Sequence, residues 1–326
     1  MLTVVTGAAG FIGSRLAEAL NRRGISEILA VDDLENAEQV GNLARLEIED
    51  YLDKRDFLER LAAGQFEGAI EAVFHQGACS DTLHTDGRYL LQNNYRYSRT
   101  LLDWCQEEKV PFLYASSAAV YGAGRAFREE RACEAPLNAY AYSKFLFDQY
   151  VRRRLPGRAA QIAGLRYFNV YGPNETHKGR MASVAFHAYR QLAADGRVKL
   201  FAGYDGFPDG GQKRDFIHVD DAVNVNLWLL EQRDVSGIYN CGTGRAQTFN
   251  QLAAEVINAV RGSNASAAEL AERKLIEYIP FPQPLAGKYQ SFTEAELSRL
   301  RLAGYHGDFA PVEQGVAAYV RHLRQA

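Results

Sequence analysis

Short apolar segments alternate with amphipathic ones along the first half of the chain. Leu2–Thr6 (LTVVT) is apolar and β-branched, and glycines follow it, which predicts a strand buried on both faces of a sheet. Apolar residues then recur at helical spacing over Phe11–Arg23, and Gly24 is a typical helix end. The same alternation predicts strands at 28–31, 72–75, 112–115 and 161–167 and helices at 54–63, 88–108 and 136–154.

Strands that alternate with helices predict an α/β fold with a doubly wound parallel sheet of the Rossmann type. After about residue 170 the alternation loosens. We expect short strands at 216–219, 237–240 and 277–279 and helices at 181–194, 220–233, 248–261, 293–302 and 311–325. The expected organisation is a dinucleotide-binding domain over 1–170, to which parts of 216–245 return, and a smaller α+β substrate-binding domain over 171–326.

Composition and charge argue against nucleic acid, a membrane or a metal ion as a partner. The chain of 326 residues has a net charge of −3 and scattered lysines and arginines, so it offers no basic surface to nucleic acid or an anionic membrane. No run approaches the ~18 apolar residues of a membrane span, and no secretory signal pattern follows Met1. The cysteines at 79, 105, 133 and 241 lack zinc-site spacing. We expect a cytoplasmic protein with no metal, nucleic-acid or membrane partner.

Glycines recur as G-x-x-G-x-x-G at Gly7, Gly10 and Gly13, between the first strand and the first helix. Glycine permits a tight turn and a close approach of backbone N–H groups to a pyrophosphate, and the helix N-terminus adds its dipole. Asp32, at the end of the second strand, stands where an acid commonly accepts hydrogen bonds from the adenosine ribose. These features predict a dinucleotide site; a turn that only packs the helix on the sheet is the alternative.

Further residues are candidates for the same site. Gly77 and Ala78, after the next predicted strand of the sheet, would let the backbone pass beside the cofactor. Asn93 would contact the cofactor, fix a loop or be a buried structural amide, and the sequence does not choose among these. Asp32 favours NAD, whereas Lys54 is a candidate for binding the 2′-phosphate of NADP.

Tyr140 and Lys144 form a Y-x-x-x-K motif on a predicted helix, where this spacing puts both on one face. A nearby ammonium lowers the pKa of a tyrosine, ordinarily about 10, by roughly one to three units. We therefore expect Lys144 to make the Tyr140 phenolate accessible, so that it takes the proton of an alcohol while hydride leaves for a nicotinamide. Tyr142 has no lysine four residues on and cannot serve equally. A lone Y-x-x-x-K on a surface helix is the alternative.

Two serines stand at the carboxyl end of the strand predicted at 112–115. Either Ser116 or Ser117 would hydrogen-bond the substrate oxygen, and Ser116 is our candidate. A glycine run, strand-end serines and Y-x-x-x-K in this order indicate a nicotinamide-dependent enzyme.

On these motifs the sequence resembles the extended short-chain dehydrogenase/reductase family and, within it, the ADP-L-glycero-D-manno-heptose 6-epimerases. The matching segments cover most of the chain. Those shared by many sugar-nucleotide enzymes are SSAAVYG (116–122), LNAYAYSKFLFDQYV (137–151) and RYFNVYGPNE (166–175). KRDFIHVDDAVNVNLWLLE (213–231) also matches. Those that point to the heptose epimerases are HKGRMASVAFH (177–187) and EYIPFPQPLAGKYQSFTEAEL (277–297).

The resemblance implies an isomerase that inverts C-6″ of ADP-D-glycero-D-manno-heptose for the lipopolysaccharide core. The inversion would pass through a transient ketone with hydride return from bound NADP. The resemblance implies two acid/base groups, Tyr140 and Lys178, one for each face of the ketone. From the residues alone, Lys178 is only a loop cation suited to a phosphate. The family also implies a homo-oligomer, a pentamer.

The resemblance further assigns binding residues. Those around the cofactor are Phe11, Ile12, Asp32, Asp33, Lys54, Gln76, Gly77, Ala78, Cys79, Ser80, Asn93, Lys144, Val170 and Lys178. Those around the ADP-sugar are Asn169, Arg180, His187, Phe201, Ala202, Gly203, Tyr204, Arg214 and Tyr289. Arg214 has independent support because a guanidinium pairs bidentately with a diphosphate. An ion pair of Arg214 with Asp215 or Asp220 is the alternative.

Three features depart from the family pattern. Gln39 replaces a lysine expected near the 2′-phosphate, Arg180 replaces a small polar residue beside Lys178, and the 205–212 loop is longer than expected. We predict NADP because Lys54 is retained, with NAD as the alternative.

Other functions fit the motifs less well. A UDP-hexose 4-epimerase would not explain Lys178 in its motif, and a 4,6-dehydratase needs an Asp-Glu pair where Ala118 and Ala119 stand. A non-enzymatic dinucleotide sensor typically loses the tyrosine or the lysine of Y-x-x-x-K, and both are present.

Overall fold

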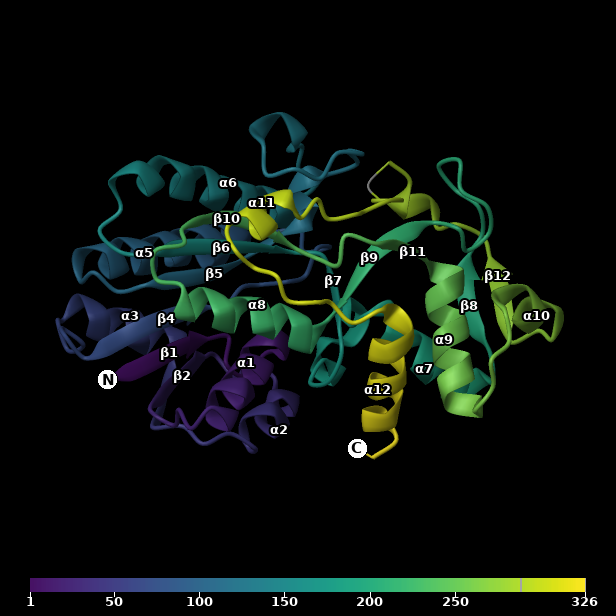
Figure 1. Ribbon diagram of the computed structural model, residues 1–326, viewed down its shortest axis with the longest axis horizontal. Coiled ribbons are helices and arrows are strands. Elements are labelled where there is room, and N and C mark those ends of the chain that lie inside the picture. The colour runs from purple at the N-terminus through teal and green to yellow at the C-terminus, as the bar shows by residue number, and fades with distance from the viewer. Residues whose placement is uncertain (288, 326) are drawn as a thin grey trace.

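The computed structural model describes residues 1–287 and 289–325, which form a larger lobe beside a smaller one (Figure 1). The larger lobe is built on a seven-stranded sheet in which every strand pair is parallel. Its strands, in spatial order, are β10 (Gly237–Cys241), β6 (Ile162–Tyr167), β5 (Phe112–Ser117), β4 (Ile70–His75), β1 (Leu2–Thr6), β2 (Ile28–Asp32) and β3 (Asp50–Asp53). The predicted fold class is confirmed.

The strand order shows where a ligand can bind. β2 and β3 lie on one side of β1, and β4, β5 and β6 lie on the other. A crevice therefore opens beyond the carboxyl ends of β1 and β4, where the order reverses. β3 was not predicted, because this edge strand, DYLD, has no apolar run.

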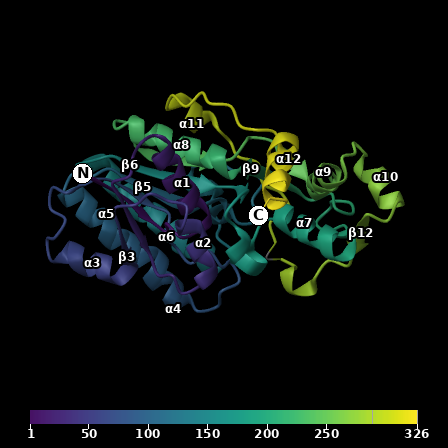
Figure 2. The same cartoon turned by 90° about the horizontal axis from the view of Figure 1, so that it is seen from below.

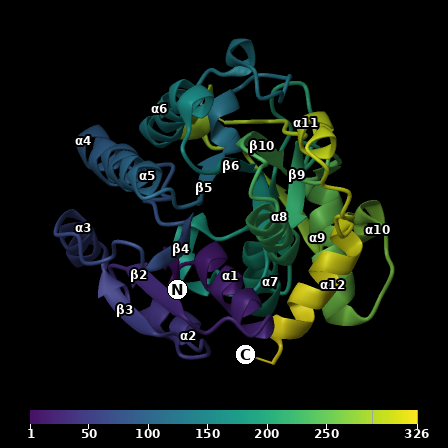
Figure 3. The ribbon, with the colours of Figure 1, turned by 60° about the vertical axis from the view of Figure 1, so that its left-hand side comes forward.

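Helices cover both faces of the sheet, as Figures 2 and 3 show. One face carries α1 (Phe11–Arg22) and α8 (Val219–Glu231), which share an apolar core with the sheet. The opposite face carries α3 (Lys54–Ala62), α5 (Tyr97–Glu107) and α6 (Ala139–Arg154) over a second core. Coverage on both sides explains the near-continuous apolar sequences of the central strands.

The helix predicted at 88–108 is interrupted. It consists of α4 (Gly87–Leu90), a π-helical segment over Leu91–Arg96 and α5. Segments of π-helix are frequent at functional sites. Here the segment carries Asn93 and Asn94, and both side chains bind groups that border the crevice.

The smaller lobe has two small sheets and its own core. Its strands are β7 (Asn169–Tyr171), β9 (Lys213–His218) and β11 (Ala246–Thr248) in one sheet and β8 (Val198–Phe201) and β12 (Ile276–Ile279) in the other. Its helices are α7 (Val184–Asp195), α9 (Phe249–Arg261), α10 (Ala267–Glu272) and α12 (Val312–Leu323). The chain returns to the larger lobe between them, because α8 packs against α1 and β10 pairs with β6.

One predicted helix is largely wrong. The segment predicted at 293–302 is helical only from Ser298, in α11 (Ser298–Leu302). Before it, the Thr293 N–H donates to the carbonyl oxygen of Lys213, and the Ala295 N–H donates to the Asp215 carboxylate at 3.0 Å. These bonds to a distant strand hold the segment extended.

The remaining elements are short. They are α2 (Val40–Leu43) and the 3₁₀ turns Ala37–Gln39, Ala118–Tyr121, Arg131–Cys133, Leu155–Gly157, Thr176–Met181 and Gln283–Leu285. Across residues 1–287 and 289–325, no helix is long and apolar enough to cross a bilayer, and no cluster of side chains could hold a metal ion.

Candidate active site

A cavity of about 750 Å³ opens at the crevice beyond β1 and β4. It brings together residues from the glycine turn, the loop after β4, the end of β5, α6 and the loop before α7. Among its lining residues are Gly7, Gly10, Phe11, Ile12, Gly13, Asp32, Gln76, Gly77, Ala78, Cys79, Ser80, Ser117, Tyr140, Lys144, Asn169, Val170, Lys178 and Arg180. Most of the predicted site residues thus meet in one place.

The glycine turn is shaped to receive a close ligand. Gly7 has φ +69°, and a Cβ atom there would lie 2.6 Å from the backbone nitrogen of Gly77. A Cβ atom on Gly13 would lie 2.0 Å from the carbonyl oxygen of Gly7. In the described chain no side chain caps the first turn of α1, so its N–H groups stay directed toward the cavity. These features fit a dinucleotide pyrophosphate.

Asp32 supports the turn from the end of β2. Its carboxylate accepts a hydrogen bond from the Ala9 N–H at 2.8 Å and one from the Asp33 N–H at 3.0 Å. Burial raises the pKa of Asp32, and these two hydrogen bonds oppose that rise. Asp32 therefore fixes the turn and also lines the cavity.

A smaller cavity of about 160 Å³ continues from the turn past Asp33, Gln39, Lys54 and Asn93. Lys54 forms an ion pair with Asp33 and donates to Asn93 Oδ1 at 3.0 Å. Burial alone would lower the pKa of Lys54, but the hydrogen bond and the charge of Asp33 raise it. Lys54 is thus a charged group whose partner is a carboxylate at the edge of the cavity.

Asn94 is a site residue that the sequence analysis missed. Its side chain accepts from the Cys79 N–H at 2.8 Å, and it donates to the Cys79 carbonyl and to Ser143 Oγ at 3.0 and 3.1 Å. Asn94 therefore ties the loop after β4 to α6, whereas the predicted Asn93 binds Lys54. Burial raises the pKa of the Cys79 thiol, which favours its neutral form.

Two buried side chains, Tyr167 and Asn226, hold Gln76 by hydrogen bonds. Tyr167 donates to Gln76 Oε1 at 2.9 Å, and Gln76 donates to Asn226 Oδ1 at 3.2 Å. Neither Tyr167 nor Asn226 was predicted as a site residue, because their contacts with Gln76 span 91 and 150 residues of chain.

Tyr140 and Lys144 lie on α6 and both line the cavity. The pKa of Tyr140, however, is raised and not lowered. The Lys144 ammonium donates to the carbonyl oxygen of Ala115 at 2.8 Å. Burial raises the pKa of Tyr140, and a hydrogen bond with Ser117 opposes this rise. The prediction that Lys144 lowers the pKa of Tyr140 is therefore wrong, because the ammonium faces a carbonyl oxygen instead. Burial lowers the pKa of Lys144 itself to about 8.

The two serines at the end of β5 bind different partners on α6. Ser117 lies beside Tyr140, whereas the Ser116 hydroxyl is buried and donates to Asp148 at 2.9 Å. Successive side chains of a strand point to opposite faces, so only one of the two can face Tyr140. Both serines line the cavity, and the hydrogen bond with Tyr140 favours Ser117 over our candidate Ser116 as the group beside the tyrosine.

Lys178 enters the same cavity from the loop before α7. Its ammonium lies 5.0 Å from the centre of the Phe11 ring, at the start of α1. Burial lowers the pKa of Lys178, and the buried carboxylate of Glu175 opposes this. The structure thus places a tyrosine and a lysine from different elements around one space, next to the glycine turn.

Arg180 lies at the mouth of this cavity. Its guanidinium pairs with Asp81 at 2.7 Å, and its side chain is 66% exposed. His187 contacts the Arg180 carbonyl at 3.3 Å. The departure from the family pattern at Arg180 thus produces a bridge between the loop after β4 and the loop before α7.

A second group of predicted residues gathers in the smaller lobe. Arg214 is buried with its guanidinium 4.8 Å from the centre of the Tyr289 ring, and burial lowers its pKa. Tyr204 stacks on Phe281 with ring centres 3.9 Å apart. The other assigned residues of this group are Phe201, Ala202 and Gly203, at the end of β8. Arg214 has no carboxylate partner in the described chain, so the ion pair with Asp215 or Asp220 is not formed. Those two carboxylates bind Thr243 and Arg15 instead.

Residues 3–242 match the NAD dependent epimerase/dehydratase family. The chain belongs to this family. A curated relative, the ADP-L-glycero-D-manno-heptose-6-epimerase of Thiobacillus denitrificans, is 57% identical over 99% of both chains. The resemblance found in the sequence is confirmed, and the protein is an epimerase of this family.

Solved structures of epimerases support the assignment. The ADP-L-glycero-D-manno-heptose-6-epimerase of Helicobacter pylori matches all of this chain and 96% of its own, at 27% identity and a TM-score of 0.83. The UDP-glucose 4-epimerase of Thermus thermophilus, solved in complex with NAD, matches all of both chains at 27% identity and a TM-score of 0.78. Nicotinamide-dependent chemistry therefore belongs to this family, and the fit of the glycine turn agrees with it.

Proposed function

We propose that the protein inverts C-6″ of ADP-D-glycero-D-manno-heptose to give ADP-L-glycero-D-manno-heptose, a precursor of the lipopolysaccharide core. The observation that carries the proposal is that Tyr140 and Lys178 line one cavity beside the glycine turn. An inversion through a ketone needs an acid/base group for each of its two faces. The name of the relative with 57% identity supports this substrate.

Bound NADP would supply hydride acceptance and return at C-6″. The residues of this chain handle the protons. Tyr140, hydrogen-bonded to Ser117, exchanges a proton with the C-6″ oxygen on one face, and Lys178 exchanges a proton with it on the other face. The lowered pKa of Lys178 suits this role, because a neutral amine is then accessible closer to neutral pH.

The smaller lobe would hold the ADP part of the substrate. Arg214 is a buried guanidinium that packs on rings and pairs with no carboxylate in the part of the chain described here. A diphosphate would satisfy it by bidentate hydrogen bonds. Tyr204, Phe281 and Tyr289 form the adjoining aromatic cluster, which suits stacking with an adenine base.

Turnover of the purified protein tests the assignment of the two bases. We expect Tyr140→Phe and Lys178→Met each to lower kcat by about 100-fold or more, as the loss of a general acid/base group does. Tyr142→Phe is the matched control, because Tyr142 lies on the same helix and its side chain is 45% exposed. Separation of the two ADP-heptose epimers by chromatography measures the rate. Near wild-type rates in both variants would rule out the two-base assignment.

The same assay in deuterated water tests the route. Hydride that leaves C-6″ and returns to it does not exchange with solvent, so the product should carry no deuterium at C-6″. Deuterium at that carbon would show direct deprotonation and contradict the proposal. UDP-glucose serves as the alternative substrate, and its faster turnover would favour a 4-epimerase.

We also propose that the cofactor is NADP rather than NAD. Lys54 lies in the smaller cavity with Gln39 and Asp33, where a 2′-phosphate could replace Asp33 as its partner. The test is to denature purified protein and identify the released dinucleotide by mass spectrometry. We expect NADP from the wild type and a larger share of NAD from Lys54→Met. NAD alone from the wild type would contradict the proposal.

Two further proposals rest on the family resemblance alone. The protein would act in the cytoplasm, and it would assemble as a homopentamer. Light scattering after size-exclusion chromatography measures the mass, and a monomer or dimer at micromolar concentration would contradict the pentamer.

A further inference from the structure

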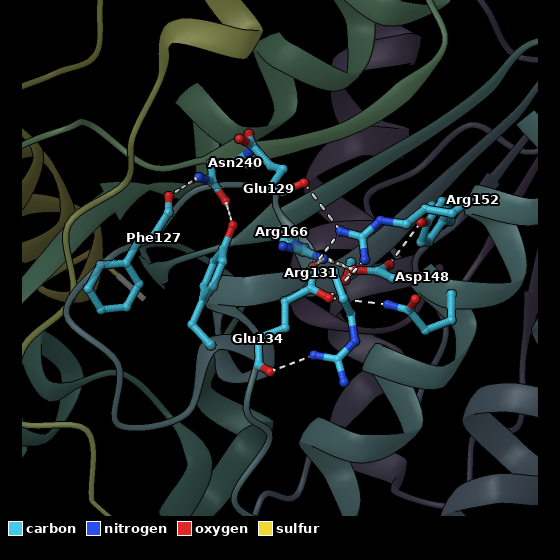
Figure 4. Close-up of polar contacts among 12 residues, drawn as sticks. Phe127, Glu129, Arg131, Glu134, Asp148, Arg152, Arg166 and Asn240 are labelled. Carbon is cyan, nitrogen blue, oxygen red and sulfur yellow. Dashed lines mark hydrogen bonds and ion pairs between the residues drawn. The ribbon is translucent and has the colours of Figure 1, made fainter.

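A buried polar network lies behind the catalytic end of β5 (Figure 4). Its centre is Asp148 on α6. The hydroxyls of Tyr114 and Ser116 each donate to the Asp148 carboxylate at 2.9 Å. Tyr114 and Ser116 are two residues apart and therefore share one face of β5. Asp148 thus joins the strand to the helix.

Arg166 of β6 completes this centre. Its Nε donates to Asp148 at 2.9 Å, and its guanidinium forms an ion pair with Glu134. The side chains of Arg166, Asp148 and Glu134 have no exposed surface. Glu134 also pairs with Arg152, one turn beyond Asp148 on α6. The network therefore contains two buried carboxylates, the buried guanidinium of Arg166 and the partly exposed guanidinium of Arg152.

The network is in register with the candidate catalytic groups. Tyr140, Lys144 and Asp148 follow each other at intervals of four residues, which places them along one side of α6. On β5, Ser116 binds Asp148, while its neighbours Ala115 and Ser117 bind Lys144 and Tyr140. A shift of the helix against the strand would therefore break all three contacts together.

We propose that Asp148 is a positioning residue of the reaction, which holds α6 against β5 so that Ser117 meets Tyr140, and which acts on Lys144 through its charge. This inference rests on the proposed function. It assigns Asp148 a role that Glu134 lacks, although both carboxylates are equally buried in one network. The difference is distance along the helix, since Asp148 lies one turn from Lys144.

The charge of Asp148 opposes the effect of burial on Lys144. Burial lowers the pKa of Lys144 to about 8, and Asp148 raises it, as does the Cys79 side chain from the loop after β4. The other titratable groups that face Lys144 are Tyr140 on its own helix and His75 at the end of β4. Burial lowers the pKa of His75 to about 3, so this ring is neutral and adds no charge.

Asp148→Asn tests the proposal, because it removes the charge and keeps the shape. We expect kcat at neutral pH to fall about tenfold through misplacement of Tyr140. We also expect the alkaline limb of the kcat profile, measured from about pH 6 to about pH 10, to move to lower pH, because Lys144 loses its proton more easily. Glu134→Gln is the matched control. It should lower the melting temperature comparably and leave the shape of the pH profile unchanged.

A second measurement does not depend on turnover. Lysine labelled with ¹³C and ¹⁵N reports the ionisation of Lys144 by NMR, once its signal is assigned with Lys144→Met. We expect the titration midpoint of Lys144 to be lower in Asp148→Asn than in the wild type and unchanged in Glu134→Gln. A wild type that does not epimerise ADP-heptose would contradict the proposed function only, because this titration still tests Asp148.

Ser116→Ala serves if Asp148→Asn does not fold. It removes one hydrogen bond between β5 and Asp148 and leaves the charge in place. We expect kcat to fall several-fold, with KM and the alkaline limb unchanged. The proposal is overturned if Asp148→Asn keeps the wild-type profile and Lys144 titration, if Glu134→Gln shifts them equally, or if Ser116→Ala keeps the wild-type kcat.

Discussion

Two buried arginines show how the larger lobe differs from the smaller one. Arg166 lies in the network behind β5 and pairs with Glu134 and Asp148. Arg214 lies against Tyr289 and Phe249 and has no carboxylate partner among the described residues. Burying a charge without a partner is costly. Arg166 has carboxylate partners within the fold, whereas the described residues give Arg214 none, as expected if Arg214 binds the proposed diphosphate.

The comparison separates residues that stabilise the fold from residues that bind. If Arg166 were removed, Asp148 would be left as a buried carboxylate without its cationic partner, and Glu134 would keep Arg152. Removal of Arg214 would leave no buried carboxylate without a partner, because the neighbours of Arg214 are aromatic rings and backbone. Substitutions of the two arginines should therefore affect different measurements.

The largest effect is expected for Arg166→Met. Breaking a buried ion pair by removing one partner costs about 3–5 kcal/mol of the free energy of unfolding. Urea denaturation of Arg166→Met and Arg214→Met measures the difference. We expect a large loss for the first variant and little loss, or a gain, for the second. Equal losses would show that Arg214 is also part of the scaffold.

A third buried cation, Lys144, lies between these extremes, since it has a carbonyl oxygen and a distant carboxylate as neighbours. Its pKa is about 8 in the folded protein and 10.5 ordinarily. Below about pH 8 the lysine is charged in both states and its burial destabilises the fold. As pH rises from about 8 to 10.5, the folded protein loses the proton first and this penalty disappears.

The wild type should therefore gain stability relative to Lys144→Met over that window, by about 3 kcal/mol at most. Denaturation of both proteins at several pH values measures the gain, and the difference between them removes the contributions of the other titrating groups. A pH-independent difference would show that Lys144 keeps its ordinary pKa. Lys199→Met is the control, because Lys199 is exposed and pairs with Asp195.

Much of this could be predicted from the sequence, but the state of the buried cations could not. The periodicity of Leu2–Thr6 and Phe11–Arg23 predicts the sheet and its first helix, because local patterns determine them. The carboxylate next to Arg214 is not its partner, since Asp215 accepts from the N–H groups of Thr243 and Ala295, 28 and 80 residues away. Contacts over such distances depend on the tertiary fold.

The serines at the end of β5 also show what the sequence alone cannot predict. The motif at 116–122 predicts that a serine faces the site. The motif does not say which of the two serines faces the site, because a shift of one residue along a strand exchanges its two faces. Asn94 was missed for a similar reason, because the π-helical segment turns it, rather than Asn93, toward the loop after β4.

The next effect concerns binding. Arg214→Met should weaken the binding of ADP by about 10- to 100-fold, since hydrogen bonds to charged groups contribute about 1.5–3 kcal/mol each. Isothermal titration with ADP alone measures the change. Arg190→Met is the matched control, because Arg190 also lies over a ring, Phe186, at 5.9 Å, but is exposed. Unchanged ADP affinity in Arg214→Met would place the diphosphate elsewhere.

The smallest effect is expected at the exposed cation, Arg180, which pairs with Asp81 across the mouth of the cavity. Exposed ion pairs contribute about 0.2–1 kcal/mol, so Arg180→Ser should change kcat/KM for ADP-heptose by less than about fivefold. Because salt screens exposed charges, high ionic strength should reduce the difference between the wild type and the variant. The double variant with Asp81→Asn should add little further loss, since either change removes the same pair. A loss as large as that of Lys178→Met would instead show that Arg180 binds the substrate. A cation that is paired in the free protein would then also bind a ligand, and the pairing of a cation would no longer separate structural from ligand-binding residues.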